Sequence, residues 1–318
     1  MAEMLPEKPF RAIFHTDYMD ILQPHDVYLH KQAHKVVIVV LRADGISTIT
    51  PPAIDARSAY QEVGFHPFAI TCLKETLFVT DRKKVTVFDK DLNKLPEREF
   101  SHELLKSPTG IDAYEEYLFV VNGKDKDSNT SIFIFQSDGR LHRIVAEGTF
   151  LDPWSLKINS EGTIFVSDTG KKQLLYSTKG SYTFIHSTGI LQENGQTMQC
   201  RGMSIDEYDN IFVALRVEGV RRQFECIKMY TKDLRVSYNI CKDLPLSGPT
   251  AGYFSSLKEI YSVKEDFQKK VLGLPAKKFD FIRGVHCSVF YGKKVLFVAD
   301  AGNECIRMLT LKKRINDE

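Results

Sequence analysis

Residues 66–91 of this chain read HPFAITCLKETLFVTDRKKVTVFDKD. The segment contains three short runs of β-branched and aromatic residues, separated by turns rich in charged residues. Such runs are typical of β-strands joined by tight turns, whereas a helix would place apolar residues three and four positions apart. The segment therefore predicts an antiparallel β-meander that begins near Pro67 and contains a strand ending at Asp81.

The same pattern recurs along the whole chain, which predicts a β-propeller. The repeats open mostly about 40 to 50 residues apart, the period of a blade of four antiparallel strands. We expect one all-β domain over residues 1–318, with seven blades favoured and six as the alternative if the first repeat is not a true blade. The predicted openings are Pro24, Pro67, Pro108, Pro153, Cys200, Pro249 and His286.

The two ends of the chain are expected to meet in one blade. The last repeat stops after its third strand, near Leu311, while FRAIFHTDY at residues 10–18 has the composition of a strand. An unpaired edge strand invites aggregation. We therefore expect residues 10–18 to pair with the last blade and close the ring.

The repeats resemble NHL repeats, which have a Pro-x-Gly-apolar opening, a strand ending in Asp, and a basic loop. The matching segments are Pro108-Thr-Gly-Ile with Phe119-Val-Val-Asn, Pro67-Phe-Ala-Ile with Phe78-Val-Thr-Asp, Pro153-Trp-Ser-Leu with Phe165-Val-Ser-Asp, and Phe297-Val-Ala-Asp. The resemblance implies a propeller that recognises other molecules; members of the family are commonly six-bladed, and some bind single-stranded RNA. Many follow RING, B-box and coiled-coil modules in ubiquitin ligases; this sequence contains none, and whether it is a fragment of such a protein stays open.

Composition points to no general polyanionic partner and to no membrane span. The 43 basic and 41 acidic residues leave a net charge of +2, so positive charge can act only in local patches. No stretch approaches the roughly 18 apolar residues of a membrane span, and residues 1–10 lack the apolar core of a signal peptide. We expect a cytoplasmic or nuclear protein, with its six scattered cysteines as thiols.

Blade topology places the openings and the loops after the second strands on one face. The opening residues expected on this face are His25, Phe68, Thr109, Trp154, Arg201, Thr250 and Cys287. The loop cations expected beside them are Arg82, Lys84, Lys124, Lys171, Lys172, Arg216, Arg221, Arg222, Lys269 and Lys270. We interpret these side chains as the ligand-binding face.

Aromatic rings beside Lys and Arg suit two kinds of partner, and the sequence leaves both open. Bases of single-stranded RNA stack on rings while cations meet phosphates, and the same residue types anchor protein interfaces. We predict a non-catalytic adaptor, a monomeric domain within a larger complex, with no cofactor and no catalytic or metal-binding residues. The alternative is a propeller hydrolase or lyase with a metal in the channel; His25, His66 and His286 lie near openings, but matching carboxylates are not evident.

Overall fold

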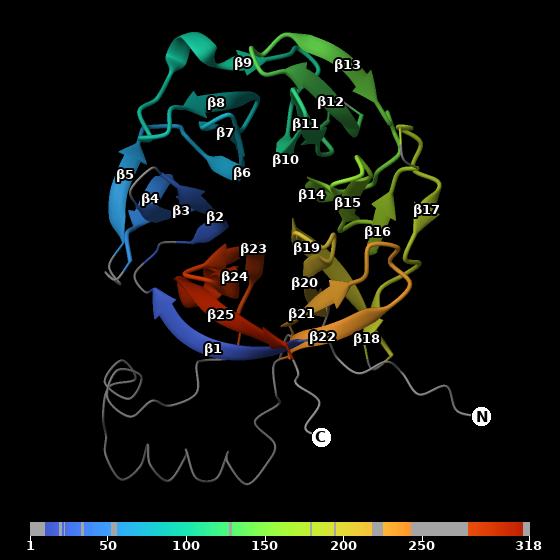
Figure 1. Cartoon of the computed structure of the whole chain (residues 1–318). Coiled ribbons are helices and arrows are strands. Elements are labelled where there is room, and N and C mark those ends of the chain that lie inside the picture. The colour runs from blue at the N-terminus through green and yellow to red at the C-terminus, as the bar shows by residue number, and fades with distance from the viewer. Residues whose placement is uncertain are drawn as a thin grey trace, which may run out of the picture.

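A computed structural model shows six antiparallel sheets arranged in a ring around a central channel (Figure 1). It describes residues 10–18, 21, 23–32, 35–51, 56–126, 129–178, 180–193, 195–217, 225–242 and 279–313. No helix in this part of the chain is long and apolar enough to cross a membrane.

The first three blades follow one another along the chain, each with its first strand innermost (Figure 1). The first blade contains β2 (Pro24–Lys31), β3 (Val36–Arg42), β4 (Gly45–Ile49) and β5 (Arg57–Gln61). The second contains β6 (Pro67–Leu73), β7 (Thr76–Asp81), β8 (Lys84–Phe88) and β9 (Phe100–Ser101), with a 3₁₀ turn η1 (Pro96–Arg98) before β9. The third contains β10 (Pro108–Tyr114), β11 (Tyr117–Asn122), β12 (Ser131–Gln136) and β13 (Leu141–Val145).

The remaining three blades include the two irregular ones. The fourth contains β14 (Pro153–Ile158), β15 (Ile164–Asp168), β16 (Gln173–Tyr176) and β17 (His186–Ser187). The fifth has an added strand and contains β18 (Gln192–Glu193), β19 (Gln196–Ile205), β20 (Ile211–Val217), β21 (Glu225–Tyr230) and β22 (Ser237–Lys242). The sixth contains β23 (Ile282–Phe290), β24 (Lys293–Asp300), β25 (Cys305–Lys313) and, from the other end of the chain, β1 (Phe10–Tyr18), with a 3₁₀ turn η2 (Ala301–Asn303) before β25.

The described residues form six blades, so the favoured number of seven was wrong. Six blades were expected only if the first repeat was not a true blade, but the first repeat is a complete blade. The extra opening was assigned to Pro249, which lies outside the described residues. No seventh blade fits there, because the inner strands of the fifth and sixth blades are direct neighbours: a Cβ built on Gly202 of β19 would lie 2.4 Å from the carbonyl oxygen of Arg283 on β23.

Strands from both ends of the chain share the sixth sheet. β1 runs antiparallel to β25, and the register pairs Phe10 with Lys313 and Tyr18 with Ile306. The sixth blade also packs against the first, since Val27 and Ile38 share an apolar cluster with Phe297. The last blade is thus held to the first by side-chain packing.

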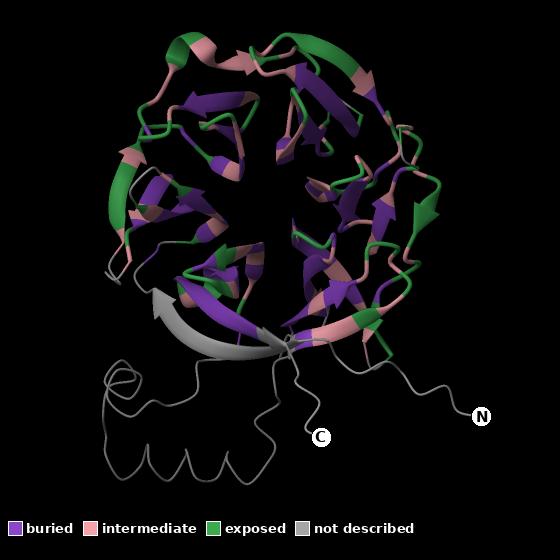
Figure 2. Cartoon of the chain, viewed as in Figure 1, coloured by how far each residue is buried: buried purple, intermediate pink, exposed green. Residues whose placement is uncertain are grey.

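The hydrophobic core lies between adjacent blades rather than inside any one of them. Six buried clusters each combine residues from two neighbouring sheets. Phe88 and Phe133, on third strands, are examples of large side chains with almost no exposure. Figure 2 shows the buried segments concentrated in the middle strands of the blades, such as β7 and β8. Burial of both sheet faces explains why strands such as VVIVVLR at β3 are continuously apolar.

Every inner strand begins with the same irregularity. The pairing register shifts at the opening of all six blades, for example between Pro24 and Asp26, and between Pro153 and Ser155. A bulge of this kind re-aims the side chain between its two flanking residues. The residue one place further along is Gly, Ala or Ser in five of the six blades and Asp26 in the first. At the glycines the neighbouring inner strand approaches closely; at Gly284 an added Cβ would lie 2.5 Å from the Asp26 carboxylate.

We expect Gly202→Ala to lower the free energy of unfolding by about 1–3 kcal/mol, the usual range for overpacking. The new Cβ would meet the backbone of Arg283 and Gly284, which cannot rotate away. Urea unfolding measures the effect. Ser155→Ala, at the equivalent position of the fourth blade, is the control because a Cβ already fits there, and equal midpoints for the two variants would contradict this account of the inner ring.

Candidate binding face

We call the end of the ring where the six inner strands begin the opening face. The residue that follows each opening lies on this face, at the mouth of the channel. The six residues at this position are His25, Phe68, Thr109, Trp154, Arg201 and Arg283. Side chains from different blades touch there. The ring centroid of Phe68 lies 5.8 Å from that of His25 and 5.0 Å from that of Trp154. The structure thus brings together the predicted residues His25, Phe68 and Trp154.

Cys287 does not belong to this set, so its prediction as an opening residue was wrong. Its side chain is buried in the apolar cluster between the fifth and sixth blades. The sixth blade opens at Ile282, four residues before the predicted opening at His286, and the residue equivalent to Cys287 is Arg283. The repeated Arg-Gly pair could have shown this, because Arg283-Gly284 matches Arg201-Gly202. Thr250 lies outside the described residues.

Three arginines gather around a single phenylalanine ring at one side of the mouth. The guanidinium carbons of Arg201, Arg216 and Arg283 lie 4.1, 4.6 and 5.1 Å from the ring centroid of Phe281. Arg201 also lies 5.4 Å from the Trp154 ring centroid. Arginine favours such positions because its planar cation is attracted to an aromatic face. We call Arg201, Arg216 and Arg283 the arginine cluster.

Glu225 anchors the segment that carries this phenylalanine. One carboxylate oxygen accepts the backbone N–H of Phe281 at 2.9 Å, and the other accepts that of Ile282 at 2.6 Å. Glu225 also lies 3.4 Å from Nε of Arg216. These bonds hold Phe281 at φ 62°, a conformation uncommon outside glycine. A similar contact occurs in the second, fourth and sixth blades, where the Asp that ends the second strand accepts a backbone N–H from the segment before the inner strand. Asp168, for example, accepts the N–H of Asp152.

The electrostatics of the mouth are those of a cationic site. Burial, followed by repulsion from Arg216, lowers the pKa of Arg201 to about 10. Burial, followed by repulsion from Arg283, lowers the pKa of His25 to about 4, so this imidazole is neutral near pH 7. Burial raises the pKa of Glu225 to about 7 despite the nearby arginines. The arginine cluster therefore carries more positive charge than Glu225 can neutralise.

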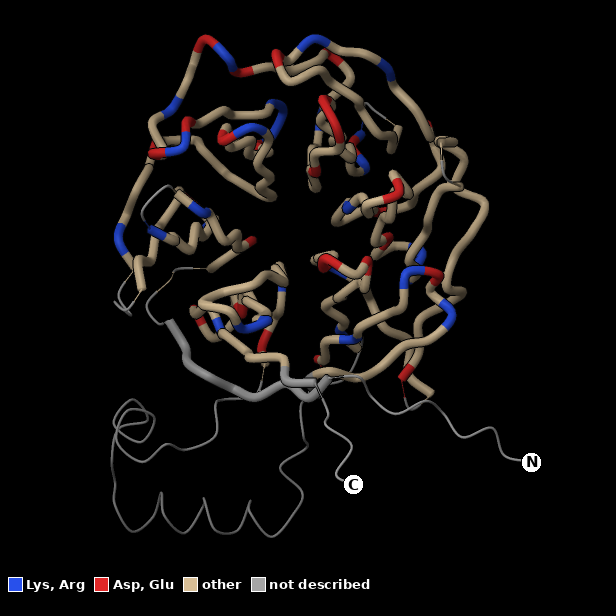
Figure 3. The backbone as a smooth tube through the Cα atoms, viewed as in Figure 1, with Lys and Arg blue, Asp and Glu red and all other residues tan. Residues whose placement is uncertain are grey.

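The predicted loop cations have different environments. Lys84 forms a 2.9 Å ion pair with Glu99, and Nζ of Lys171 donates to the carbonyl oxygen of Thr149 at 2.6 Å. Arg82 and Lys124 are exposed, and Lys172 is half-buried in the loop before β16. The other predicted cations, Arg221, Arg222, Lys269 and Lys270, lie outside the described residues. Figure 3 shows acidic and basic residues mixed around the ring, so the loop lysines do not make a uniformly basic face.

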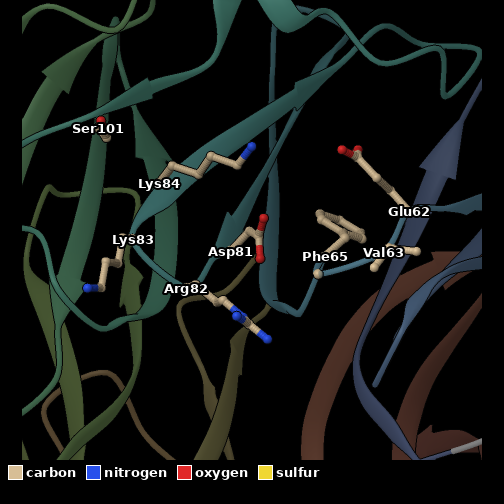
Figure 4. Close-up of a pocket in the computed structure, with 9 residues that line it drawn as sticks. Glu62, Val63, Phe65, Asp81, Arg82, Lys83, Lys84 and Ser101 are labelled. Carbon is tan, nitrogen blue, oxygen red and sulfur yellow. The ribbon is translucent and has the colours of Figure 1, made fainter.

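A larger hollow lies beside the hairpin between β7 and β8. It has a volume of about 480 Å³ and lies between residues 62–65 and residues 81–84. Figure 4 shows Val63 beside Phe65, and the side chains of Lys84 and Glu62 extending toward one another. The hollow is open and has charged groups of both signs, so it is a mixed surface at the second blade, whereas the arginine cluster lies on the fifth and sixth blades.

Four exposed aliphatic side chains surround the mouth, a feature that the sequence analysis missed. They lie on the connections that lead from one blade to the next and are Val63, Leu104, Leu151 and Ile190, with 103%, 45%, 47% and 58% relative exposure. Each is adjacent to a loop that follows a second strand; for example, Val63 lines the hollow beside residues 81–84. We call these four residues the aliphatic rim. The regular spacing of these four residues along the sequence would have revealed the aliphatic rim.

Deeper in the channel the polar groups are paired with the protein itself. Asp26 accepts the backbone N–H groups of Val27 and Ile70, and burial raises its pKa to about 6. His286 lies 4.9 Å from the Tyr28 ring, and burial lowers its pKa to about 3. Within the described ranges, no group of three or more His, Cys, Asp and Glu side chains could hold a metal ion.

Comparisons with known proteins identify the fold. No family model and no curated protein matches the chain. A streptogramin B lyase structure matches with a TM-score of 0.56 and 9% identity, covering 93% of this chain and 97% of that one. A virginiamycin B lyase from Staphylococcus aureus matches with a TM-score of 0.54 and 12% identity, covering 95% of this chain and 100% of that one. A structure of a nidogen/laminin complex matches with a TM-score of 0.53 and 14% identity, covering 70% of this chain and 80% of that one. The similar structures thus include enzymes, but identities this low show the fold alone: the chain is a β-propeller of four-stranded antiparallel blades.

Proposed function

We propose that this chain is a recognition module that binds a protein partner through its opening face and serves as a non-catalytic adaptor in a larger complex. The observation that carries the proposal is the aliphatic rim around a cationic and aromatic centre. Exposed apolar groups near a buried Arg and a half-buried Trp are typical of protein interfaces, whose anchors are enriched in these two residues. The resemblance of the repeats to NHL repeats supports the same function.

The environment of the aromatic residues favours protein over single-stranded RNA. A base needs an open ring face on which to stack. The Trp154 ring is covered on one side by Arg201 and contacted by Phe68, and the Phe281 ring carries three guanidinium groups. Lys84 and Lys171, which would meet phosphates, already have partners. Aliphatic side chains, in contrast, add nothing to phosphate binding.

A reducing compartment suits the cysteines. Cys72, Cys200 and Cys287 are free thiols, and the last two are buried. Burial raises the pKa of all three thiols, which keeps them protonated and unreactive. We therefore propose that the protein works in the cytoplasm or the nucleus.

The proposal is tested by crosslinking pull-downs of the full chain with and without nuclease. We expect a protein partner that survives nuclease and whose recovery falls at least about tenfold in the double variant Leu104→Glu with Leu151→Glu, because charge at an apolar contact must be desolvated without a counter-ion. Leu141→Glu is the matched control, since Leu141 is exposed on the outer strand β13. Release of the bound material by nuclease, or equal recovery with the rim variant and the control, would contradict a protein-binding face.

A further inference from the structure

The arginine cluster has donors that the described part of the protein does not satisfy. Nε of Arg201 is buried without an acceptor, and so is Nε of Arg283. Arg201 is only 6% exposed, and its Nη1 donates to the carbonyl oxygen of Ile282 at 3.2 Å. For Arg283 neither a hydrogen bond nor an ion pair joins the guanidinium to any described residue; its contact is the face of Phe281. Buried donors are nearly always satisfied, so these require an acceptor.

The charge balance also calls for an anion. Arg201 and Arg216 share one carboxylate, that of Glu225, and both of its oxygens already accept backbone N–H groups. Within the described residues, Arg283 has no ion pair. Repulsion from Arg216 and Arg283 adds to burial in lowering the pKa of Arg201. A cluster of this kind is stabilised when an external anion supplies the missing negative charge.

The chemistry of the site suits a carboxylate. The guanidinium groups of Arg201 and Arg283 lie over the Phe281 ring, and the Nε–H of each is without an acceptor, while guanidinium groups bind carboxylates bidentately. The adjoining channel cavity, lined by Phe68, Trp154 and Arg283 among others, has a volume of only about 20 Å³. That is the space of about one water molecule. A nucleotide base does not fit this space.

We propose that Arg201 and Arg283, supported by Arg216, form a carboxylate-binding site that seats an acidic side chain or the C-terminal carboxylate of the protein partner. This inference rests on the proposed function, because it names the chemistry by which the opening face recognises its partner. Trp154 and Phe68 form the apolar wall of the site, and the aliphatic rim contacts the flanking residues of the bound segment.

The test uses the full chain and two arrays of nonapeptides with randomised flanks, one with a fixed central Glu and one with central Gln. Each array is made with a free C-terminal acid and with an amide, so that a side-chain carboxylate is distinguished from a chain terminus. Peptides selected from the arrays are then titrated by fluorescence anisotropy. We expect binding that weakens at least about tenfold when the carboxylate is replaced by its amide, the size of a charge-assisted, bidentate contact.

Arg283→Gln is the decisive variant, because Arg283 has no structural hydrogen bond to lose within the described residues. It should weaken binding by a similar factor and remove the preference for the carboxylate. Arg82→Gln, at an exposed arginine of the β7–β8 hairpin, is the charge-matched control and should change affinity less than twofold. Four results would overturn the inference: equal binding of acid and amide peptides, retention of the carboxylate preference in Arg283→Gln, binding of a single-stranded oligonucleotide instead, or no peptide binding. Peptide binding that depends on Leu104 and Leu151 but not on the carboxylate would overturn this inference and leave the proposed function standing.

Discussion

Removal of β1 is expected to lower the free energy of unfolding by about 3 kcal/mol or more and to make the protein aggregate. The truncated chain loses the backbone hydrogen bonds between β1 and β25, each with a net contribution of about 0.5–1.5 kcal/mol. It also exposes β25 as an unpaired edge, which is a template for pairing with other chains. Urea unfolding and light scattering measure the two effects.

The control for this truncation starts the chain at residue 10 and so retains all of β1. We expect its unfolding midpoint to match that of the full chain. If the chain that starts at residue 19 had the same midpoint and remained monomeric, the pairing of the two termini would not be what holds the sixth blade in place.

Glu225→Ala is expected to cost about 3–5 kcal/mol of stability, the range for removing one partner of a buried charge pair. Glu225 is 1% exposed, and its loss leaves the N–H groups of Phe281 and Ile282 without their acceptors. It also leaves Arg216 and Arg201 without their nearby negative charge. Urea unfolding gives the loss, and Glu225→Gln, which keeps one acceptor oxygen, should fall between Glu225→Ala and the unaltered chain.

Glu161→Ala is the matched control for this prediction. Glu161 also forms an ion pair at 3.4 Å, with Lys232, but both side chains are about half exposed or more. Exposed pairs of this kind contribute about 0–1 kcal/mol. A similar loss in Glu161→Ala and Glu225→Ala would mean that Glu225 is not the anchor of the segment beneath the arginine cluster.

The sequence was sufficient to predict the blade and its orientation. Proline marks the bulged start of the inner strand in the first four blades, and the opening of the fifth was found at Cys200. The sixth was missed because Ile282 replaces proline there. The segment at Pro249 misled because its Gly-Pro-Thr start is also typical of an opening, and local composition cannot show that the fifth and sixth blades are direct neighbours in space.

The binding face was predicted in part. His25, Phe68, Trp154 and Arg201 were expected together because the repeat phase places them at one end of the ring. Arg283 and Phe281 were not expected, because the opening of this blade was placed at His286 instead of Ile282. The role of Glu225 could not be predicted at all: in the second, fourth and sixth blades an Asp at the end of the second strand anchors the segment before the inner strand, whereas Glu225 lies on β21 of the fifth blade, anchors a segment of the sixth and pairs with Arg216.

Photo-crosslinking from the mouth of the channel tests the central claim most directly. A benzophenone amino acid placed at Phe68 samples the opening face, and one placed at Tyr291 samples the opposite end of the ring, in the turn between β23 and β24 where Tyr291 is 73% exposed. The account predicts that the position at Phe68 crosslinks a protein partner and that crosslinking falls in Arg283→Gln. Crosslinks from the Tyr291 position alone, or to nucleic acid at the Phe68 position, would contradict it.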